Sequence, residues 1–434
     1  MVMDYYHMND SPGPSSAGAL SSFHHYYEQC DIIGKGPFSQ VHRVVHRVSG
    51  QQYAVKIIDI RKYCAYSGLT PNDLRHEIEI CAQLKHPFIM ELYETFSTDG
   101  FVYLIFEYLD GMDICFEVVK RATAGFVYSE AVASHYIKQI LHAIAYCHER
   151  GIVHRDVRPQ AALLANKENS APIKLGGFAV SMRLPDPFAA VHGGRIGTPH
   201  FMAPEMVSKQ PYGTAVDLWG AGVLLYILLS GQMPFNGPTH HVYESIIQGR
   251  YNLKTIVWSH VSEYAKDLLV KLLTVDPSRR ITAADALQHP WLKDRDRCAS
   301  RRHLHDAVEE MRKFNMRRKL KSTVLAVVHS NKWHNDKSTS AGMKDANDAD
   351  TQTPLYRGVQ QVLFTLDQIA ALTDRVTASD QQLWSFLQMA LDDRQLHEML
   401  ELSILGLFQS EEKRETPRPQ RQKLPVFDGH FTIH

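Results

Sequence analysis

The residues best suited to chemistry begin with a glycine-rich string at residues 34–41, Gly-Lys-Gly-Pro-Phe-Ser-Gln-Val, between two strand-like segments. Small residues let a backbone approach a polyphosphate, and the backbone amides can donate hydrogen bonds to its oxygens. Lys56 follows on the next predicted strand and Glu77 on the next predicted helix. A lysine ammonium can bind phosphate oxygens, and a carboxylate can hold that ammonium in place. An ordinary hairpin turn explains the glycines equally well, so the prediction of a nucleotide site depends on all three features together.

A second group of motifs follows along the chain. The string His-Arg-Asp at residues 154–156 supplies a candidate general base in Asp156, and Arg158 supplies a cation two residues later. Residues 203–205 (Ala-Pro-Glu) and 217–219 (Asp-Leu-Trp) come next. Five motifs in this order and at these intervals resemble those of a protein kinase.

The elements that would position these residues can be predicted from the apolar pattern. Strand-like runs fill residues 29–56, residues 74–84 have helical spacing, and residues 90–108 indicate two strands around a turn. A long helix is predicted over residues 129–148, and helices dominate residues 200–291. The sequence thus predicts an α+β, two-lobed protein kinase fold, with a cleft between a small β-rich lobe and a larger helical lobe.

The resemblance assigns roles around this cleft. Val41, Ala54 and Leu163 are expected to enclose an adenine ring, with Phe106 behind it and the backbone of residues 107–109 at its edge. Two alternatives stay open, namely that the Lys56–Glu77 pair only orients a helix and that Asp156 only accepts backbone hydrogen bonds. The predicted catalytic residues are Asp156, Lys56 and Arg158. The predicted nucleotide-binding residues are Ile33, Gly34, Lys35, Gly36, Ser39, Val41, Ala54, Lys56, Glu77, Phe106, Glu107, Leu109 and Leu163.

The sequence departs from the kinase pattern at both positions that normally hold magnesium. An Asn is expected five residues after Asp156 and an Asp before Phe178, but Ala161 and Gly177 stand there. Magnesium needs near-octahedral oxygen ligands, and neither side chain has an oxygen. We therefore predict ATP binding without a magnesium requirement. Losing about 4–7 kcal/mol of metal stabilisation would slow phosphate transfer roughly a thousand- to hundred-thousandfold.

Several longer strings narrow the resemblance to one family. They include residues 33–39, 125–135, 174–178 (Lys-Leu-Gly-Gly-Phe) and 313–321. They resemble the calmodulin-dependent kinase group, and most specifically the membrane-associated guanylate kinase scaffolds. The resemblance implies a pseudokinase with at most weak Ser/Thr transfer that assembles adhesion-receptor complexes. It also implies a cytoplasmic, peripheral location at the plasma membrane, cell junctions and synapses. The alternatives are a conventional magnesium-dependent, calmodulin-regulated kinase and an adaptor whose cleft binds no nucleotide.

A basic stretch at residues 304–328 follows the predicted kinase domain. Basic amphipathic helices are typical of calmodulin targets or membrane-surface helices, whereas a helix packed on the large lobe with a solvated basic face is the alternative. Both descriptions can hold for one segment. Ala307 occupies the place of the autophosphorylated Thr of calmodulin-dependent kinase II, so autonomous activation by that route is not expected. The predicted calmodulin contacts are Phe314, Arg317, Arg318, Lys319, Leu320, Val324 and Leu325.

The C-terminal part carries a further helical unit. Its apolar residues near positions 400–407 cover more than one helix face, which favours a unit completed by a partner over a self-sufficient three-helix bundle. It resembles the all-α heterodimerisation domain of Lin-type polarity scaffolds. The predicted organisation is a disordered N-terminus (1–24), a kinase-like domain (25–292), a regulatory calmodulin-binding segment (293–328), a linker (329–354), the heterodimerisation domain (355–409) and a disordered tail (410–434).

Composition excludes several other classes. Lys+Arg and Asp+Glu balance at 47 each, which argues against a nucleic-acid partner. No apolar run is long enough to span a bilayer, and no secretory signal opens the chain. The six cysteines are scattered without metal-type spacing, which favours reduced cytosolic thiols, and the 24 histidines indicate no metal site.

Overall fold

The computed structural model describes residues 22–36, 39–67, 70–98, 100–168, 171–237 and 239–328 of the 434-residue chain. The predictions for residues 1–21, for the linker at 329–354, for the heterodimerisation domain at 355–409 and for the tail lie outside these residues. In the described residues, no helix is both long and apolar enough to cross a membrane.

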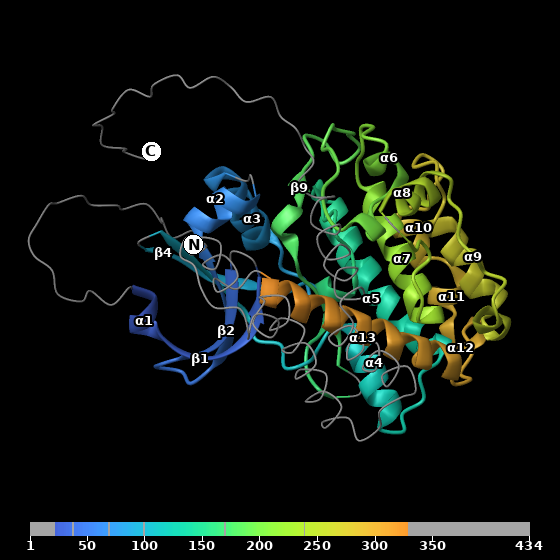
Figure 1. Cartoon of the computed structure of the whole chain (residues 1–434), viewed down its shortest axis with the longest axis horizontal. Coiled ribbons are helices and arrows are strands. Elements are labelled where there is room, and N and C mark those ends of the chain that lie inside the picture. Colours follow the sequence, from blue (N-terminus) through green and yellow to red (C-terminus); the bar gives the residue numbers. More distant parts are fainter. Residues whose placement is uncertain are drawn as a thin grey trace, which may run out of the picture. The chain divides into compact units, whose positions relative to one another are not determined.

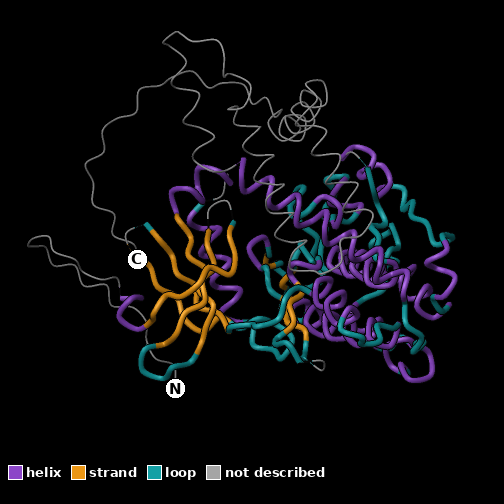
Figure 2. Tube along the Cα trace, turned by 60° about the horizontal axis from the view of Figure 1, so that its bottom comes forward, coloured by secondary structure: helices purple, strands orange, loops and turns teal. Residues whose placement is uncertain are grey.

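The small lobe is built on one antiparallel sheet with the strand order β1-β2-β3-β5-β4 (Figures 1 and 2). The connections after β2 and after β4 each contain a glycine with positive φ, Gly50 and Gly100, a conformation that costs glycine little. The strands are β1 (Tyr27–Lys35), β2 (Ser39–His46), β3 (Gln52–Asp59), β4 (Leu92–Thr98) and β5 (Phe101–Glu107). They confirm the predicted strand-like runs.

Two helices, α2 (Ile60–Ser67) and α3 (Pro71–Gln83), follow β3. Thr70 caps α3 in a capping box with Asp73, and Pro71 occupies the first turn, where its missing N–H costs nothing. The buried residues of α3 are Leu74, Glu77, Ile80 and Cys81, which recur at helical spacing along one face. This face turns Glu77 inward toward the sheet.

The first described residues form a helix that starts before the predicted domain boundary at residue 25. This helix, α1 (Ser22–Tyr26), precedes β1, and Phe23 is fully buried. The Phe23 ring stacks on Tyr103 with 4.6 Å between ring centroids and belongs to a small aromatic core on one face of the sheet. The sequence carries no local signal for this contact, because Phe23 follows a Ser- and Gly-rich stretch.

The large lobe surrounds one buried helix, α7, in which nearly every residue from Val216 to Ser230 is buried. Glu205 and Arg280 form an ion pair inside this lobe, with both side chains almost completely buried. The helices are α4 (Ile114–Thr123), α5 (Glu130–His148), α6 (Pro204–Val207), α7 (Ala215–Ser230), α8 (Thr239–Ile247), α9 (Glu263–Leu272), α10 (Ala283–Leu287), α11 (Pro290–Lys293) and α12 (Arg295–Cys298).

Short strands and 3₁₀ turns carry the two loops that hold the predicted catalytic residues and the substituted metal positions. β6 (Ile152–Val153) pairs with β9 (Met182–Arg183), and β7 (Ala162–Leu164) pairs with β8 (Ile173–Leu175). The 3₁₀ turns are Pro159–Ala161 and Phe178–Val180. The loop at residues 154–161, which we call the catalytic loop, thus lies next to the start of residues 177–205, which we call the activation segment.

The long helix α13 (His305–Val328) confirms the predicted helix at residues 304–328. Ala307, Val308 and Met311 are buried against the large lobe. The side-chain amide of Asn315 donates to the carbonyl of Cys115 on α4 at 2.8 Å. The first half of α13 is thus packed on the lobe, as in the second of the two sequence interpretations (Figure 1).

Candidate nucleotide-binding site

Strand register brings the predicted adenine and phosphate contacts to one face of the small-lobe sheet. Val41 lies opposite Lys56, and Ala54 lies opposite Phe106. Cross-strand partners share a face, as do residues two apart on one strand. Val41, Ala54, Lys56 and Phe106 therefore point to the same side, away from the aromatic core under Phe23.

The glycine-rich string forms the turn between β1 and β2. Gly34 lies opposite Val41, and a Cβ on Gly34 would meet the Val41 side chain at 3.4 Å. The amide of Gly36 donates to the carbonyl of Ser39 at 2.8 Å, which closes the turn. Ile33 is half-exposed at its base. The side chain of Lys35 lies outside the described residues.

Lys56 and Glu77 form the predicted ion pair. The Lys56 Nζ lies 2.6 Å from Glu77 Oε1, and the Glu77 side chain is nearly fully buried. A buried carboxylate beside a partly exposed ammonium fixes the position of that ammonium at the sheet face. The alternative that the pair only orients α3 stays open, because the same contact does both.

The catalytic loop presents Asp156 with both carboxylate oxygens engaged. Oδ1 accepts a hydrogen bond from the amide of Thr198 at 3.0 Å. Oδ2 lies 2.7 Å from Nε of Arg158, whose N–H is not aligned for a hydrogen bond, so that this contact is an ion pair. An acceptor hydroxyl would compete with Arg158 for Oδ2 before Asp156 could take its proton.

Asp217 of α7 holds the catalytic loop through hydrogen bonds. Its carboxylate accepts hydrogen bonds from the amides of His154 and Arg155, each at 2.8 Å, and from the ring of His148. Burial by itself raises the pKa of Asp217, but the hydrogen bond and charge of His148 outweigh it, and the pKa lies below its ordinary value. The charged form of Asp217 is therefore the one that holds the loop, including Arg155 in its positive-φ conformation.

The two positions that lack metal-binding side chains face each other. A Cβ on Gly177 would lie 3.4 Å from Cβ of Ala161. Gly177 has a φ of 82°, and it precedes Phe178, which is buried against the ring of His154. The structure thus brings the two substituted positions to one place and offers no side-chain oxygen from either. Ala179, two residues after Gly177, has negative φ and is exposed.

Glu107, predicted to lie at the edge of the adenine ring, is held by an ion pair with Lys174 of the large lobe. Glu107 accepts a hydrogen bond from the amide of Glu91 at 2.8 Å, and its carboxylate lies 2.9 Å from Nζ of Lys174. Lys174 lies opposite Leu163 in the β7–β8 pair, so the predicted floor and edge of the adenine site are linked. Neither Lys174 nor Thr198 could be assigned a role from the sequence, because nothing local indicates partners this distant along the chain. Leu109 lies on the chain just after Glu107 and is half-buried.

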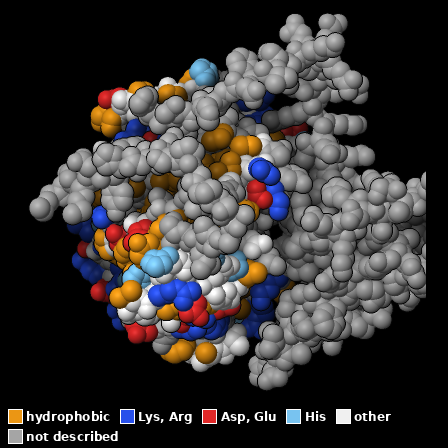
Figure 3. Space-filling model, turned by 90° about the vertical axis from the view of Figure 1, so that its left-hand side faces the viewer, with side chains coloured by type: hydrophobic (Ala, Val, Ile, Leu, Met, Phe, Trp, Pro, Cys, Tyr) orange, Lys and Arg blue, Asp and Glu red, His pale blue; other side chains and the backbone are white. Residues whose placement is uncertain are grey.

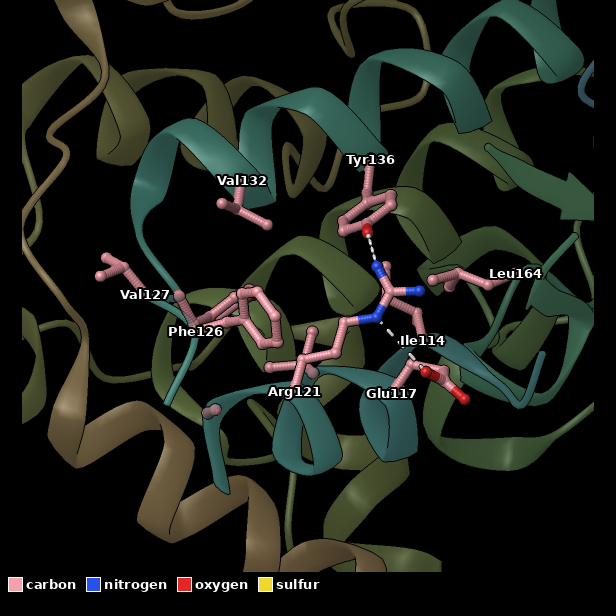
Figure 4. Close-up of a pocket in the computed structure, with 11 residues that line it drawn as sticks. Ile114, Glu117, Arg121, Phe126, Val127, Val132, Tyr136 and Leu164 are labelled. Atoms are coloured by element: carbon pink, nitrogen blue, oxygen red, sulfur yellow. Dashed lines mark hydrogen bonds and ion pairs between the residues drawn. The ribbon is translucent and has the colours of Figure 1, made fainter. Parts of the chain in front are cut away.

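A separate cavity of about 140 Å³ opens between α4 and α5 (Figure 4). Its polar floor is Arg121, which donates to Tyr136 Oη at 3.0 Å and to Glu117 at 3.3 Å, and its rim carries the exposed Phe126. Leu164 lines this cavity, whereas its neighbour Leu163 is the predicted adenine floor. Consecutive strand residues point to opposite faces, so β7 separates the cavity from the nucleotide cleft.

The predicted calmodulin contacts all fall on α13. Phe314 is half-buried and packs against the large-lobe core. Arg318 and Lys319 follow one turn later on the helix. For Arg317, Leu320, Val324 and Leu325 the structure describes the helix but not the side chains, so their proposed contacts stay predictions.

Comparisons with known proteins agree with the fold described above. Residues 27–292 match the protein kinase domain family. The chain is also 43% identical over 303 residues to protein lin-2 of Caenorhabditis elegans, a match that covers 70% of this chain and 31% of lin-2. The match thus spans less than a third of the length of that relative.

Proposed function

Because this chain belongs to the protein kinase family, we propose that it is a scaffold of the membrane-associated guanylate kinase type whose kinase domain binds ATP without magnesium. Its transfer of phosphate to Ser or Thr is slow. The similarity to protein lin-2 and the family-specific strings support the scaffold assignment. The same resemblance supports adhesion-receptor complexes as targets, and a cytoplasmic location at the plasma membrane, cell junctions and synapses.

One observation carries the proposal about the metal. Ala161 and Gly177 meet where two loops approach the expected triphosphate, and neither contributes an oxygen. ATP oxygens and water would then be the main ligands of any magnesium ion. The retained Lys56–Glu77 pair and the adenine-facing residues Val41, Ala54 and Phe106 support nucleotide binding by apolar burial and a single ammonium.

A titration with a fluorescent ATP analogue tests this proposal. We expect equal or tighter binding in EDTA than in added magnesium. Binding that tightens strongly with magnesium would favour a conventional magnesium-dependent kinase. No binding in either buffer would favour a pure adaptor.

The matched variant restores both missing groups. Ala161→Asn with Gly177→Asp places two oxygen-bearing side chains 3.4 Å apart at Cβ, and Asp tolerates positive φ better than most residues. We expect magnesium-dependent turnover to rise by at least about tenfold, since each 1.36 kcal/mol of metal stabilisation is tenfold in rate. Asp296→Asn, an exposed position in the large lobe, is the control and should change nothing.

We further propose calmodulin as a partner of α13, on the basis of its basic and apolar residues. Phe314 packs on the lobe, so calmodulin would have to draw this part of the helix away from it. The segment at residues 355–409, which the sequence predicts to be helical, is proposed to pair with a Lin-type scaffold. Tests of both follow at the scale of elements and of the whole molecule.

A further inference from the structure

The activation segment contacts Asp156, the candidate base, and carries Arg195, whose side chain is held by two contacts. Thr198 donates its amide to Asp156, and Gly197 lies so close to the catalytic loop that a Cβ there would be 2.5 Å from the carbonyl of Arg155. Three residues before Thr198, Arg195 is exposed. An acceptor peptide that brings a hydroxyl to Asp156 must therefore pass along this segment.

Arg195 is held in place without being neutralised. Its Nε donates to the carbonyl of Val207 on α6 at 2.7 Å, and its guanidinium lies over the Tyr243 ring of α8, 4.8 Å from the centroid. Neither partner carries a negative charge. A guanidinium whose stem is fixed and whose charge is free is pre-organised to bind a carboxylate or a phosphate.

Two carboxylates of the neighbouring elements are buried in ion pairs. Glu205 of α6 pairs with Arg280, and Glu117 of α4 lies beside Lys120 and Arg121. In the activation segment the exposed Asp186 accepts the neutral amide of Phe188 and keeps its charge, and on α8 Glu244 lies 3.6 Å from His241. Glu205 and Glu117 are therefore closed to a basic peptide, and Asp186 lies nine residues before Arg195 along the segment.

The geometry points to Ser/Thr peptides with acidic flanking residues as the substrate class, recognised through Arg195. Phosphorylation of such a peptide rests on the proposed function, whereas binding of the peptide does not. Electrostatic recognition of this kind discriminates partners by the sign of their charge and weakens as salt is raised.

The test compares two synthetic peptides with the same central Ser, one flanked by Asp and Glu and the other by Lys and Arg. Fluorescence anisotropy on the full chain with ATP measures binding, and phosphate transfer is followed separately. We expect the acidic peptide to bind about tenfold tighter at low salt. Arg195→Glu should reverse the preference and Arg195→Gln should bring the two affinities close to parity. Arg301→Glu, the same charge change at an exposed residue, should leave the preference intact.

The outcomes are separable. Equal binding of both peptides, binding of neither, or the same response to Arg195→Glu and Arg301→Glu overturns the inference. Selective binding of the acidic peptide without transfer to any peptide leaves the inference standing and overturns the proposed phosphate transfer. Should Arg195→Glu fail to fold, Arg195→Gln decides alone, because it removes the charge without adding a new one.

Discussion

At the scale of single residues, the expected phosphate transfer depends on which kinase residues are present and which are substituted. Lys56, Glu77 and Asp156 occupy positions that a kinase requires, whereas Ala161 and Gly177 remove the oxygens that would bind a metal. Asp156 accepts a hydrogen bond from the amide of Thr198 and pairs with Arg158, so its position depends on contacts that involve neither Ala161 nor Gly177. Loss of metal ligands therefore does not imply loss of the site.

Asp217 gives a residue-scale prediction about stability. Its folded pKa is lowered, so its carboxylate contributes stability that is present above the unfolded pKa of about 3.9 and is lost as the pH falls below it. Asp217→Asn should lower the free energy of unfolding by about 3 kcal/mol at pH 7, because Asn keeps only one acceptor oxygen and turns an NH2 donor toward a buried donor that the second carboxylate oxygen accepts from. Denaturant unfolding at pH 7 and at about pH 3, below the unfolded pKa, measures both effects, and the difference from the natural chain should shrink at the lower pH.

The control for this prediction is Asp296→Asn, which alters an exposed ion pair worth at most about 1 kcal/mol. A constant difference between the Asp217 variant and the natural chain across this pH range would contradict the assignment of the charged form.

At the scale of elements, α13 joins the regulatory prediction to the packing of the large lobe. Gly231 ends α7 with a φ of 70°, and a Cβ there would lie 2.3 Å from the carbonyl of Ala307 and 2.4 Å from the amide of Met311. The backbone of α13 therefore rests directly on this glycine. Any ligand that binds α13 away from the lobe competes with this contact and with the Asn315 hydrogen bond.

Gly231→Ala should loosen α13 and raise calmodulin affinity about tenfold, since each 1.4 kcal/mol lost from the packed state is tenfold in binding. The same change should lower the free energy of unfolding by about 1–3 kcal/mol. Calorimetric titration with calmodulin and thermal melting measure the two effects. Gly50→Ala is the matched control, because Gly50 has the same φ of 70° and nothing within 4 Å of the added Cβ. Equal effects of the two variants would show that backbone strain, not contact with α13, is responsible.

At the scale of the whole molecule, the described residues form two hydrophobic clusters. The larger cluster joins the large lobe to α3 and one face of the small-lobe sheet, and the smaller one is the aromatic core under Phe23. On the described surface in Figure 3, acidic and basic side chains are interspersed, as expected for a chain with equal numbers of both. The first half of α13 belongs to the larger cluster through Ala307, Val308 and Met311.

A chain that ends at Val328 should consequently melt within about 2 °C of the full chain, because a stability change under roughly 0.5 kcal/mol moves the midpoint that little. Residues 355–409 expressed alone should self-associate or fold poorly, since so short a unit buries a limited core. Thermal melting and analytical ultracentrifugation test the two fragments. A monomeric, cooperatively melting 355–409 fragment would argue against the heterodimer proposal.

Much of the site could be predicted because its signals are local. The strand runs, the α3 pattern around Glu77 and the order of the motifs each depend on neighbours in sequence, and the structure confirms them. The packing of Phe23, just before the predicted boundary at residue 25, could not be predicted, because its partner Tyr103 lies on a strand about eighty residues away. Lys174 and Arg195 were missed for the same reason, since their partners come from other elements.

By itself, the sequence determined the kinase fold and the loss of metal-binding oxygens at positions 161 and 177, because residue type alone decides whether an oxygen exists. Only the tertiary structure showed that these two positions are adjacent, that Arg158 pairs with Asp156 and that the backbone of α13 contacts Gly231. Such contacts join segments that are distant along the chain, and their geometry follows from how the whole core packs.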